Sequence, residues 1–155
     1  MPDQVTIRAD TSVFGFDVGS KRIGVAIGSA LGAGARALAV VEVRGNGPDW
    51  ELLDRLHQDW RPGGLVVGDP LTLDGKDQPA RQRAHAFARQ LRQRYRLPVL
   101  LVDERSSSVE AARRFAGARA EGRLRRRDAE SLDAVAAAVI VERWLAAPEQ
   151  AHPLS

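Results

Sequence analysis

The order of strand-like and helix-like segments constrains the fold of this chain most. Three β-type runs come first, joined by short glycine-containing connections, at residues 13–18, 23–27 and 36–43. Helix-like and strand-like segments then alternate, with helical periodicity at 49–60 and 78–95 and buried-looking strands at 65–68 and 99–102. An antiparallel meander of three strands followed by βαβ units predicts an α/β fold, with helices packed on a mixed five-stranded sheet.

The last third of the chain continues as helix. A helix is expected to open at residues 106–108, where Ser107 and Glu110 fit a capping box, and the basic stretch 121–127 links it to a final helix over 128–145. We find no repeat, no low-complexity segment and no boundary of a second domain. The 155 residues are therefore expected to form a single domain, 1–155, with its core at about 13–147.

One carboxylate interrupts the apolar face of the final helix. The helical period places Asp133 on the same face as Ala137, Ile140 and Trp144, which predicts that it faces the core. A buried carboxylate is costly unless a cation or strong donors compensate it. A metal ion meets this requirement, and so does a buried arginine.

Two further acids stand at the ends of predicted strands. Asp17 comes late in the first strand, and Glu104 closely follows the last one. Ligands of α/β sheets tend to lie beyond the carboxyl ends of parallel strands, so these acids and Asp133 meet there if the final helix crosses that edge. Such a triad suits one or two Mg²⁺ or Mn²⁺ ions. The alternative is three separate local roles: a turn cap for Asp17, a pair between Glu104 and Arg105, and an arginine beside Asp133.

Composition excludes several classes of protein. Hydrophobic residues make up 44% of the chain and charged residues 28%, and no apolar run reaches the roughly 18 residues of a membrane span. The chain has no cysteine, which excludes disulfides and thiolate metal sites, and residues 1–10 carry no signal-peptide pattern. We therefore expect a cytoplasmic protein that does not bind a membrane.

Arginines are concentrated on two segments, residues 78–96 and 119–127, although the formal net charge is only +3. Residues 78–96 hold six arginines and no acid, and the period of the helix gathers several of them on one face beside an apolar stripe: Arg81, His85, Arg89, Arg92 and Arg96. A basic face binds nucleic acid through its phosphates. We predict such contacts for Lys21, Arg22, Arg81, Arg89, Arg92, Arg105, Arg125 and Arg126. The alternative for each is a solvated surface or a local salt bridge.

Small residues follow the first acid. Gly19, Gly24, Ala26 and Gly28 leave space beside the second strand. Two uses of that space remain open: close approach of a ligand, or tight packing of a helix on the sheet.

Four motifs together resemble the YqgF (RuvX) family, whose members are described as pre-16S rRNA nucleases or Holliday junction resolvases. They occur in family order as Asp17-Val-Gly-Ser-Lys-Arg-Ile-Gly-Val-Ala26, Gly68-Asp-Pro-Leu-Thr-Leu-Asp-Gly75, Asp103-Glu-Arg-Ser-Ser-Ser108 and Leu132-Asp-Ala-Val-Ala-Ala137. The resemblance implies a ribonuclease H-like fold and divalent-metal nuclease chemistry. It also implies that Asp17, Glu104 and Asp133 match the acidic positions of the family.

One residue departs from the usual family pattern. Members usually have Gly-Leu-Pro-Leu where this chain has Gly68-Asp69-Pro70-Leu71. We expect Asp69 to lie on a solvated loop, with an additional carboxylate near the site as the alternative. Asp103 precedes Glu104 and should point to the opposite side of an extended segment, which makes it the second choice for that metal ligand.

The acids and the resemblance together predict a hydrolase of phosphodiester bonds. The leading expectation is processing of the 5′ end of pre-16S rRNA, for which one site in a monomer suffices. Resolution of a Holliday junction is the alternative, and its paired cuts call for a homodimer. A third possibility is a nucleic-acid-binding module without catalysis. The Asp17-x-Gly pattern also resembles the phosphate loop of actin-like ATPases, but those need two such domains, for which 155 residues leave no room.

Overall fold

The computed structural model describes residues 7, 10–29, 31–32, 34–70, 78–103 and 132–154. Their strands are β1 (Ser12–Val18), β2 (Arg22–Ser29), β3 (Gly34–Arg44), β4 (Gly47–Pro48), β5 (Gly64–Asp69), β6 (Val99–Asp103) and β7 (His152–Pro153). Their helices are α1 (Trp50–Trp60), α2 (Gln78–Tyr95), α4 (Leu132–Ala146) and the 3-10 turn η2 (Pro148–Gln150). The helix predicted to open at 106–108 lies outside the described residues. No helix in the described ranges is both long and apolar enough to cross a membrane.

The sheet has the predicted mixed topology but more strands than expected. Its order is β4-β3-β2-β1-β5-β6-β7, with β1 to β3 antiparallel and β1, β5 and β6 parallel to one another. The prediction of five strands was too low because β4 and β7 are two residues long each. So short a strand carries no alternation that a sequence pattern can reveal.

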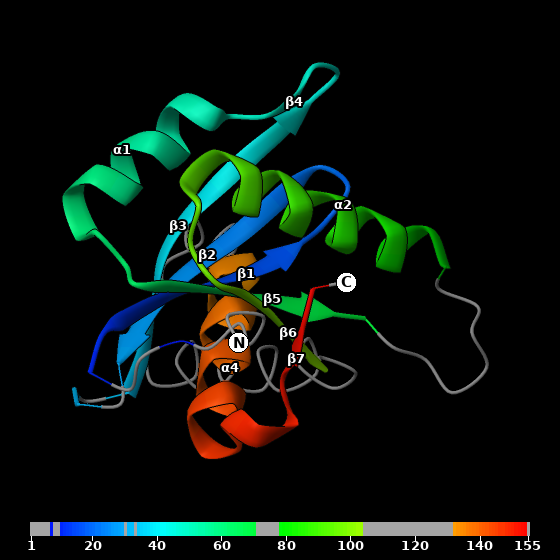
Figure 1. Ribbon diagram of the computed structural model, residues 1–155. Helices are drawn as coiled ribbons and strands as arrows, with labels where there is room; N and C mark the ends of the chain where they lie inside the picture. Colours follow the sequence, from blue (N-terminus) through cyan, green and yellow to red (C-terminus); the bar gives the residue numbers. More distant parts are fainter. Residues whose placement is uncertain are drawn as a thin grey trace, which may run out of the picture.

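Helices cover both faces of the sheet, with α1 and α2 on one side and α4 on the other (Figure 1). Successive side chains of β1 point to opposite faces of the sheet, which explains the two layers. Phe14 and Phe16 pack with α1 and α2, whereas Val13 packs with α4. The α4 face includes Ala137, Ile140 and Trp144, all buried as predicted. Each side of the sheet therefore has its own hydrophobic cluster.

An ion pair joins the two helices of the first layer. The guanidinium of Arg94 in α2 donates two hydrogen bonds to the carboxylate of Asp54 in α1, at 2.6 and 2.8 Å, and the hydroxyl of Tyr95 donates a third at 2.7 Å. The hydrogen bond from Arg94 is the main cause that lowers the pKa of Asp54 from 3.8 to about 2. Burial, followed by the bond to Asp54, raises the pKa of Tyr95 above its usual range.

This pair predicts a specific acid sensitivity. The folded pKa of Asp54 is lowered, so its stabilising effect is present above the unfolded value of 3.8 and is lost as the pH falls towards about 2. The urea midpoint of the wild type should therefore fall more steeply between these values than that of Asp54→Asn. Asp59→Asn, which changes an exposed carboxyl on the same helix, is the control and should keep the slope of the wild type. Equal slopes in all three proteins would contradict the assignment.

Candidate active site at the carboxyl edge of the sheet

Two of the three predicted acids lie near the carboxyl end of β1. Asp17 pairs across the β1–β2 ladder with Gly24, and the backbone of Asp133 packs directly on Gly24. Gly15, two residues before Asp17, faces Val141 of α4, so alternation directs Asp17 to that same face. Asp17 and the start of α4, which carries Asp133, therefore lie on the same face of the sheet, although residues 17 and 133 are far apart in the sequence.

A basic turn lies beside these acids. The amide of Gly19 donates to the carbonyl of Arg22 at 2.9 Å, which closes the predicted tight connection between β1 and β2. Nε of Arg22 donates to Oδ2 of Asp133 at 2.9 Å, with the two side chains 49% and 32% exposed. The prediction that Asp133 is buried on the core face was therefore too strong, because its carboxylate lies at the rim of that face. Its compensating arginine is exposed rather than buried.

The donor set at this edge suits a hard divalent ion, since Asp17 and Asp133 both offer carboxylate oxygens. Within the residues that the structure describes, no group of three or more His, Asp or Glu side chains is arranged to hold a metal ion. Glu104, the third predicted ligand, lies outside them, as do Arg105, Arg125 and Arg126. The described part of the site thus contributes two carboxylates and the Arg22 guanidinium.

The small residues of β2 serve helix packing. A Cβ placed on Gly24 would overlap the carbonyl group of Asp133 and lie 2.7 Å from the amide nitrogen of Ala134. A Cβ on Gly28 would lie 2.7 Å from the Val141 side chain, and Ala26 is fully buried in the cluster around α4. Of the two uses left open by the sequence, close packing of a helix is therefore correct at Gly24 and Gly28, and Asp133 is positioned by it.

The expectation that Asp69 lies on a solvated loop is wrong. Asp69 is the last residue of β5 and its side chain is fully buried on the α2 side of the sheet. Nε of Arg81 donates to its Oδ1 at 3.1 Å, and Nε2 of His152 lies 3.3 Å from Oδ2. Nε2 of His85 is 3.2 Å from Oδ1 but makes no hydrogen bond. One arginine and two histidines therefore surround a buried carboxylate, which the sequence did not indicate.

Part of the basic face of α2 is consequently used within the chain. Arg81 and His85 face Asp69, and Nη1 of Arg92 donates to the carbonyl of Leu154 at 3.4 Å. Arg89 is exposed and, with Arg81, Gln82 and His85, lines a shallow hollow of about 310 Å³. The apolar side of α2 packs as predicted. Of the two arginines that line the hollow, Arg81 pairs with Asp69, whereas Arg89 does not.

The cluster around Asp69 predicts that a double substitution is less destabilising than a single one. Arg81→Met leaves the buried carboxylate short of its main donor and should lower the free energy of unfolding by about 2 kcal/mol. Asp69→Asn combined with Arg81→Met should recover about half of that loss, because no buried charge remains. Arg83→Met, at an exposed arginine of the same helix, should stay within about 0.5 kcal/mol of the wild type. A double variant no more stable than Arg81→Met in urea unfolding would contradict this account.

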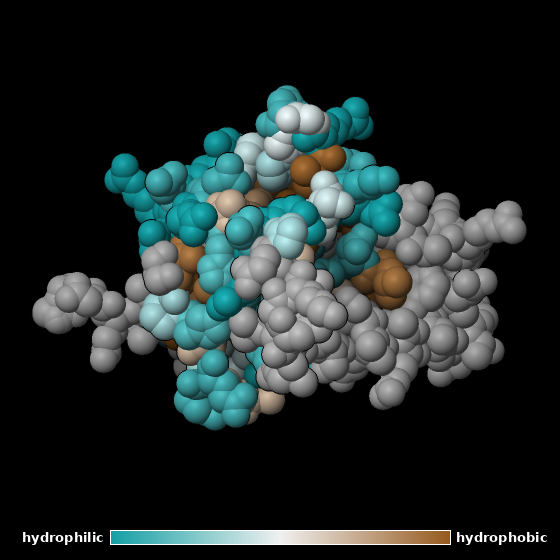
Figure 2. All heavy atoms as spheres, turned by 90° about the vertical axis from the view of Figure 1, so that its right-hand side faces the viewer, coloured by the Kyte–Doolittle hydropathy of each residue, from teal (hydrophilic) through white to brown (hydrophobic). Residues whose placement is uncertain are grey.

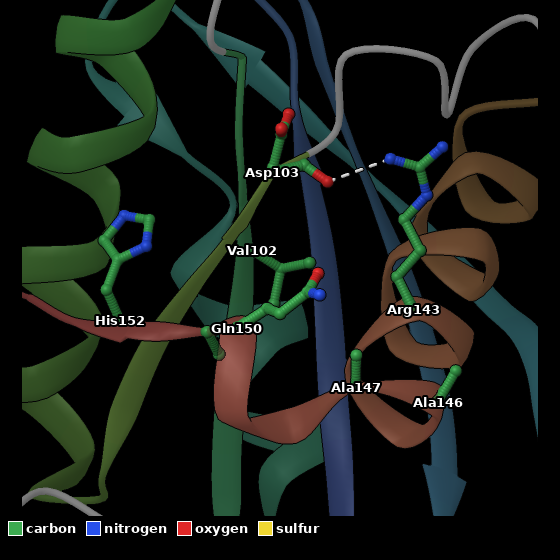
Figure 3. A pocket seen from close by; sticks show the side chains of 8 residues that line it. Val102, Asp103, Arg143, Ala146, Ala147, Gln150 and His152 are labelled. Carbon is green, nitrogen blue, oxygen red and sulfur yellow. Dashed lines mark hydrogen bonds between the residues drawn. The ribbon is translucent and has the colours of Figure 1, made fainter.

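The C-terminal segment was missed by the sequence prediction. His152 and Pro153 form β7, which pairs antiparallel with β6 at Leu101 and Leu100, and Leu154 is buried. Between β6, η2 and the end of α4 lies a hollow of about 520 Å³ lined by Asp103, Arg143 and His152 (Figure 3). Nη1 of Arg143 donates to the backbone carbonyl of Asp103 at 3.0 Å. Alternation places the Asp103 side chain with Leu101, on the face opposite Asp17.

Hydrophilic side chains form most of the described surface on the side of the molecule towards which β1 and β5 run (Figure 2). Figure 2 views the molecule from this side and shows polar side chains interrupted by small hydrophobic patches over the described residues. The view in Figure 2 therefore shows no extended apolar patch among the described residues on this side.

The mixed sheet with helices on both faces is also found in solved structures of ribonuclease H-like fold. The chain resembles RuvC of Thermus thermophilus in two structures, one of them titled as a complex with Holliday junction substrate. Identity is 20% in each, coverage is 92% of this chain and 99% of RuvC, and the TM-scores are 0.53 and 0.52. The protein therefore has the ribonuclease H-like fold.

Sequence comparison defines the family. The pattern of the RuvX family, described as Holliday junction resolvase, matches residues 11–147. Relatives named "Putative pre-16S rRNA nuclease" from Xanthomonas axonopodis pv. citri and Xanthomonas campestris pv. campestris are 77% and 75% identical over 151 residues, which is 97% of each chain. The chain belongs to the RuvX family, as the four motifs predicted. Family membership places it among the nucleases, hydrolases that act on nucleic acid.

Proposed function

We propose that this protein is a divalent-metal-dependent nuclease that processes the 5′ end of pre-16S rRNA. The observation that carries the proposal is the packing of the Asp133 backbone on Gly24, the ladder partner of Asp17, at the carboxyl edge of the sheet. The names of the relatives support an rRNA precursor as substrate. We place the reaction in the cytoplasm, in keeping with the sequence.

Each acid has a defined part in this proposal. Asp17 from β1 and Asp133 from α4 provide oxygen ligands from two rigid elements, and Glu104 completes the set. One or two Mg²⁺ or Mn²⁺ ions, when bound, would activate water and stabilise the leaving oxygen of the phosphodiester. The contribution of the chain is to hold these carboxylates at a fixed spacing through the packing of α4 on β2.

Basic side chains around this edge would position the substrate. Lys21 and Arg22 are exposed at the β1–β2 turn, and Arg89 is exposed on α2. We assign phosphate contacts to them and, outside the described residues, to Arg105, Arg125 and Arg126. Arg81 and Arg92 contribute less, because Asp69 and the Leu154 carbonyl already engage them.

Cleavage assays with two substrates test the proposal. The purified protein should shorten a 5′-extended pre-16S rRNA fragment with Mg²⁺ or Mn²⁺, and chelation by EDTA should abolish the reaction. Undiminished cleavage in EDTA would contradict the metal mechanism. If the protein leaves the RNA fragment uncut but makes paired nicks in a four-way DNA junction, the assignment to rRNA is contradicted.

Junction resolution is the second candidate, because the family description names that activity. Paired cuts across a two-fold symmetric junction need two sites, so this function predicts a homodimer. Sedimentation of the protein with and without junction DNA should distinguish the two functions. A monomer under both conditions favours RNA processing.

A further inference from the structure

The ion pair between Arg22 and Asp133 lies inside the candidate site. Arg22 is two residues before Gly24 in β2 and therefore faces α4, as Asp17 does from β1. Its Nε is 2.9 Å from Oδ2 of Asp133. A carboxylate that we assign to the metal is thus also the acceptor for a guanidinium of the same chain.

A guanidinium and a divalent ion that bind the same carboxylate repel each other. Both are positive, so each weakens the binding of the other, and the repulsion grows with the double charge of the ion. The Arg22 side chain is 49% exposed, and exposed ion pairs stabilise a fold little. The ion pair itself therefore adds little to the stability of the fold.

We propose that Arg22 competes with the divalent cation for Asp133, so that binding of the cation releases the guanidinium for a substrate phosphate. This inference rests on the proposed function and adds a coupling between metal and nucleic acid. The coupling is reciprocal: a phosphate that draws Arg22 away from Asp133 also strengthens metal binding. Arg22 is in this role a positioning residue that links two ligands of one site.

Calorimetric titration of the full chain with Mn²⁺ tests the competition without any measure of activity. Arg22→Gln should bind Mn²⁺ about fivefold more tightly than the wild type, because a unit charge near the ion is removed. Lys21→Gln removes the same charge from the adjacent residue, at the same exposed turn, and should change the affinity by less than about twofold. Circular dichroism should show the same fold for each variant, since both side chains are exposed.

Asp133→Asn separates the inference from the function on which it rests. If this variant binds Mn²⁺ more weakly than the wild type while Arg22→Gln binds no more tightly, the competition is wrong and the metal site stands. If Asp133→Asn binds Mn²⁺ as the wild type does, Asp133 is not a ligand and both ideas fail. An equal gain of Mn²⁺ affinity in Lys21→Gln and Arg22→Gln would also overturn the competition. The loss of positive charge at the turn would then explain the gain without any contact to Asp133.

Discussion

Asp17→Asn should retain the fold of the wild type and lose about 100-fold or more of the metal-dependent cleavage rate. Asparagine has nearly the shape of aspartate, and Asp17 is only half-buried at the end of β1, so the packing is preserved. The substitution removes the negative charge of Asp17, close to the place where α4 carries Asp133. Stabilisation of a transition state by metal ions amounts to several kcal/mol, and about 2.7 kcal/mol corresponds to a 100-fold change in rate.

Asp103→Asn is the matched control for this loss. Asp103 is also an aspartate at the carboxyl end of a parallel strand, but its side chain lies on the face opposite Asp17. Its cleavage rate should stay within about threefold of the wild type. Single-turnover rates at saturating Mn²⁺, together with thermal unfolding, provide the measurements. An Asp17→Asn variant that cleaves as fast as the wild type would exclude the carboxylate mechanism.

Local sequence patterns predict most of the elements, because apolar residues recur with a clear period in the strands and helices. α2 has the predicted bounds, Gln78–Tyr95, and β1 begins one residue before the predicted strand. The position of Asp17 at the end of β1 follows from the same pattern. That the final helix brings Asp133 to the same edge was predicted from fold geometry, and the packing of the Asp133 backbone on Gly24 agrees with it.

Partners that are distant in the sequence could not be predicted in this way. His152, 83 residues beyond Asp69, comes within 3.3 Å of its carboxylate through β7, and no local period encodes that approach. The same holds for the bonds of Arg94 to Asp54, 40 residues apart, and of Arg22 to Asp133. In each case the sequence shows a charged residue, and only the fold shows the group that compensates it.

Gly24 shows how packing and the candidate site depend on one another. Its missing side chain lets α4 approach β2 so closely that the backbone of Asp133 occupies the space. The helix must be this close if the Asp133 carboxylate is to reach the level of Asp17. Stability and metal binding should therefore change together when this space is filled.

Gly24→Ala should lower the free energy of unfolding by about 3 kcal/mol or more and weaken Mn²⁺ binding at the same time. The added Cβ would overlap the carbonyl group of Asp133, which is backbone and cannot rotate away as a flexible side chain does. The helix must then shift and carry Asp133 away from Asp17. Gly45→Ala, where a Cβ meets nothing within 4 Å, should stay within about 0.5 kcal/mol. Urea unfolding and calorimetry measure both effects, and a Gly24→Ala protein as stable as the wild type would show that α4 does not depend on this contact.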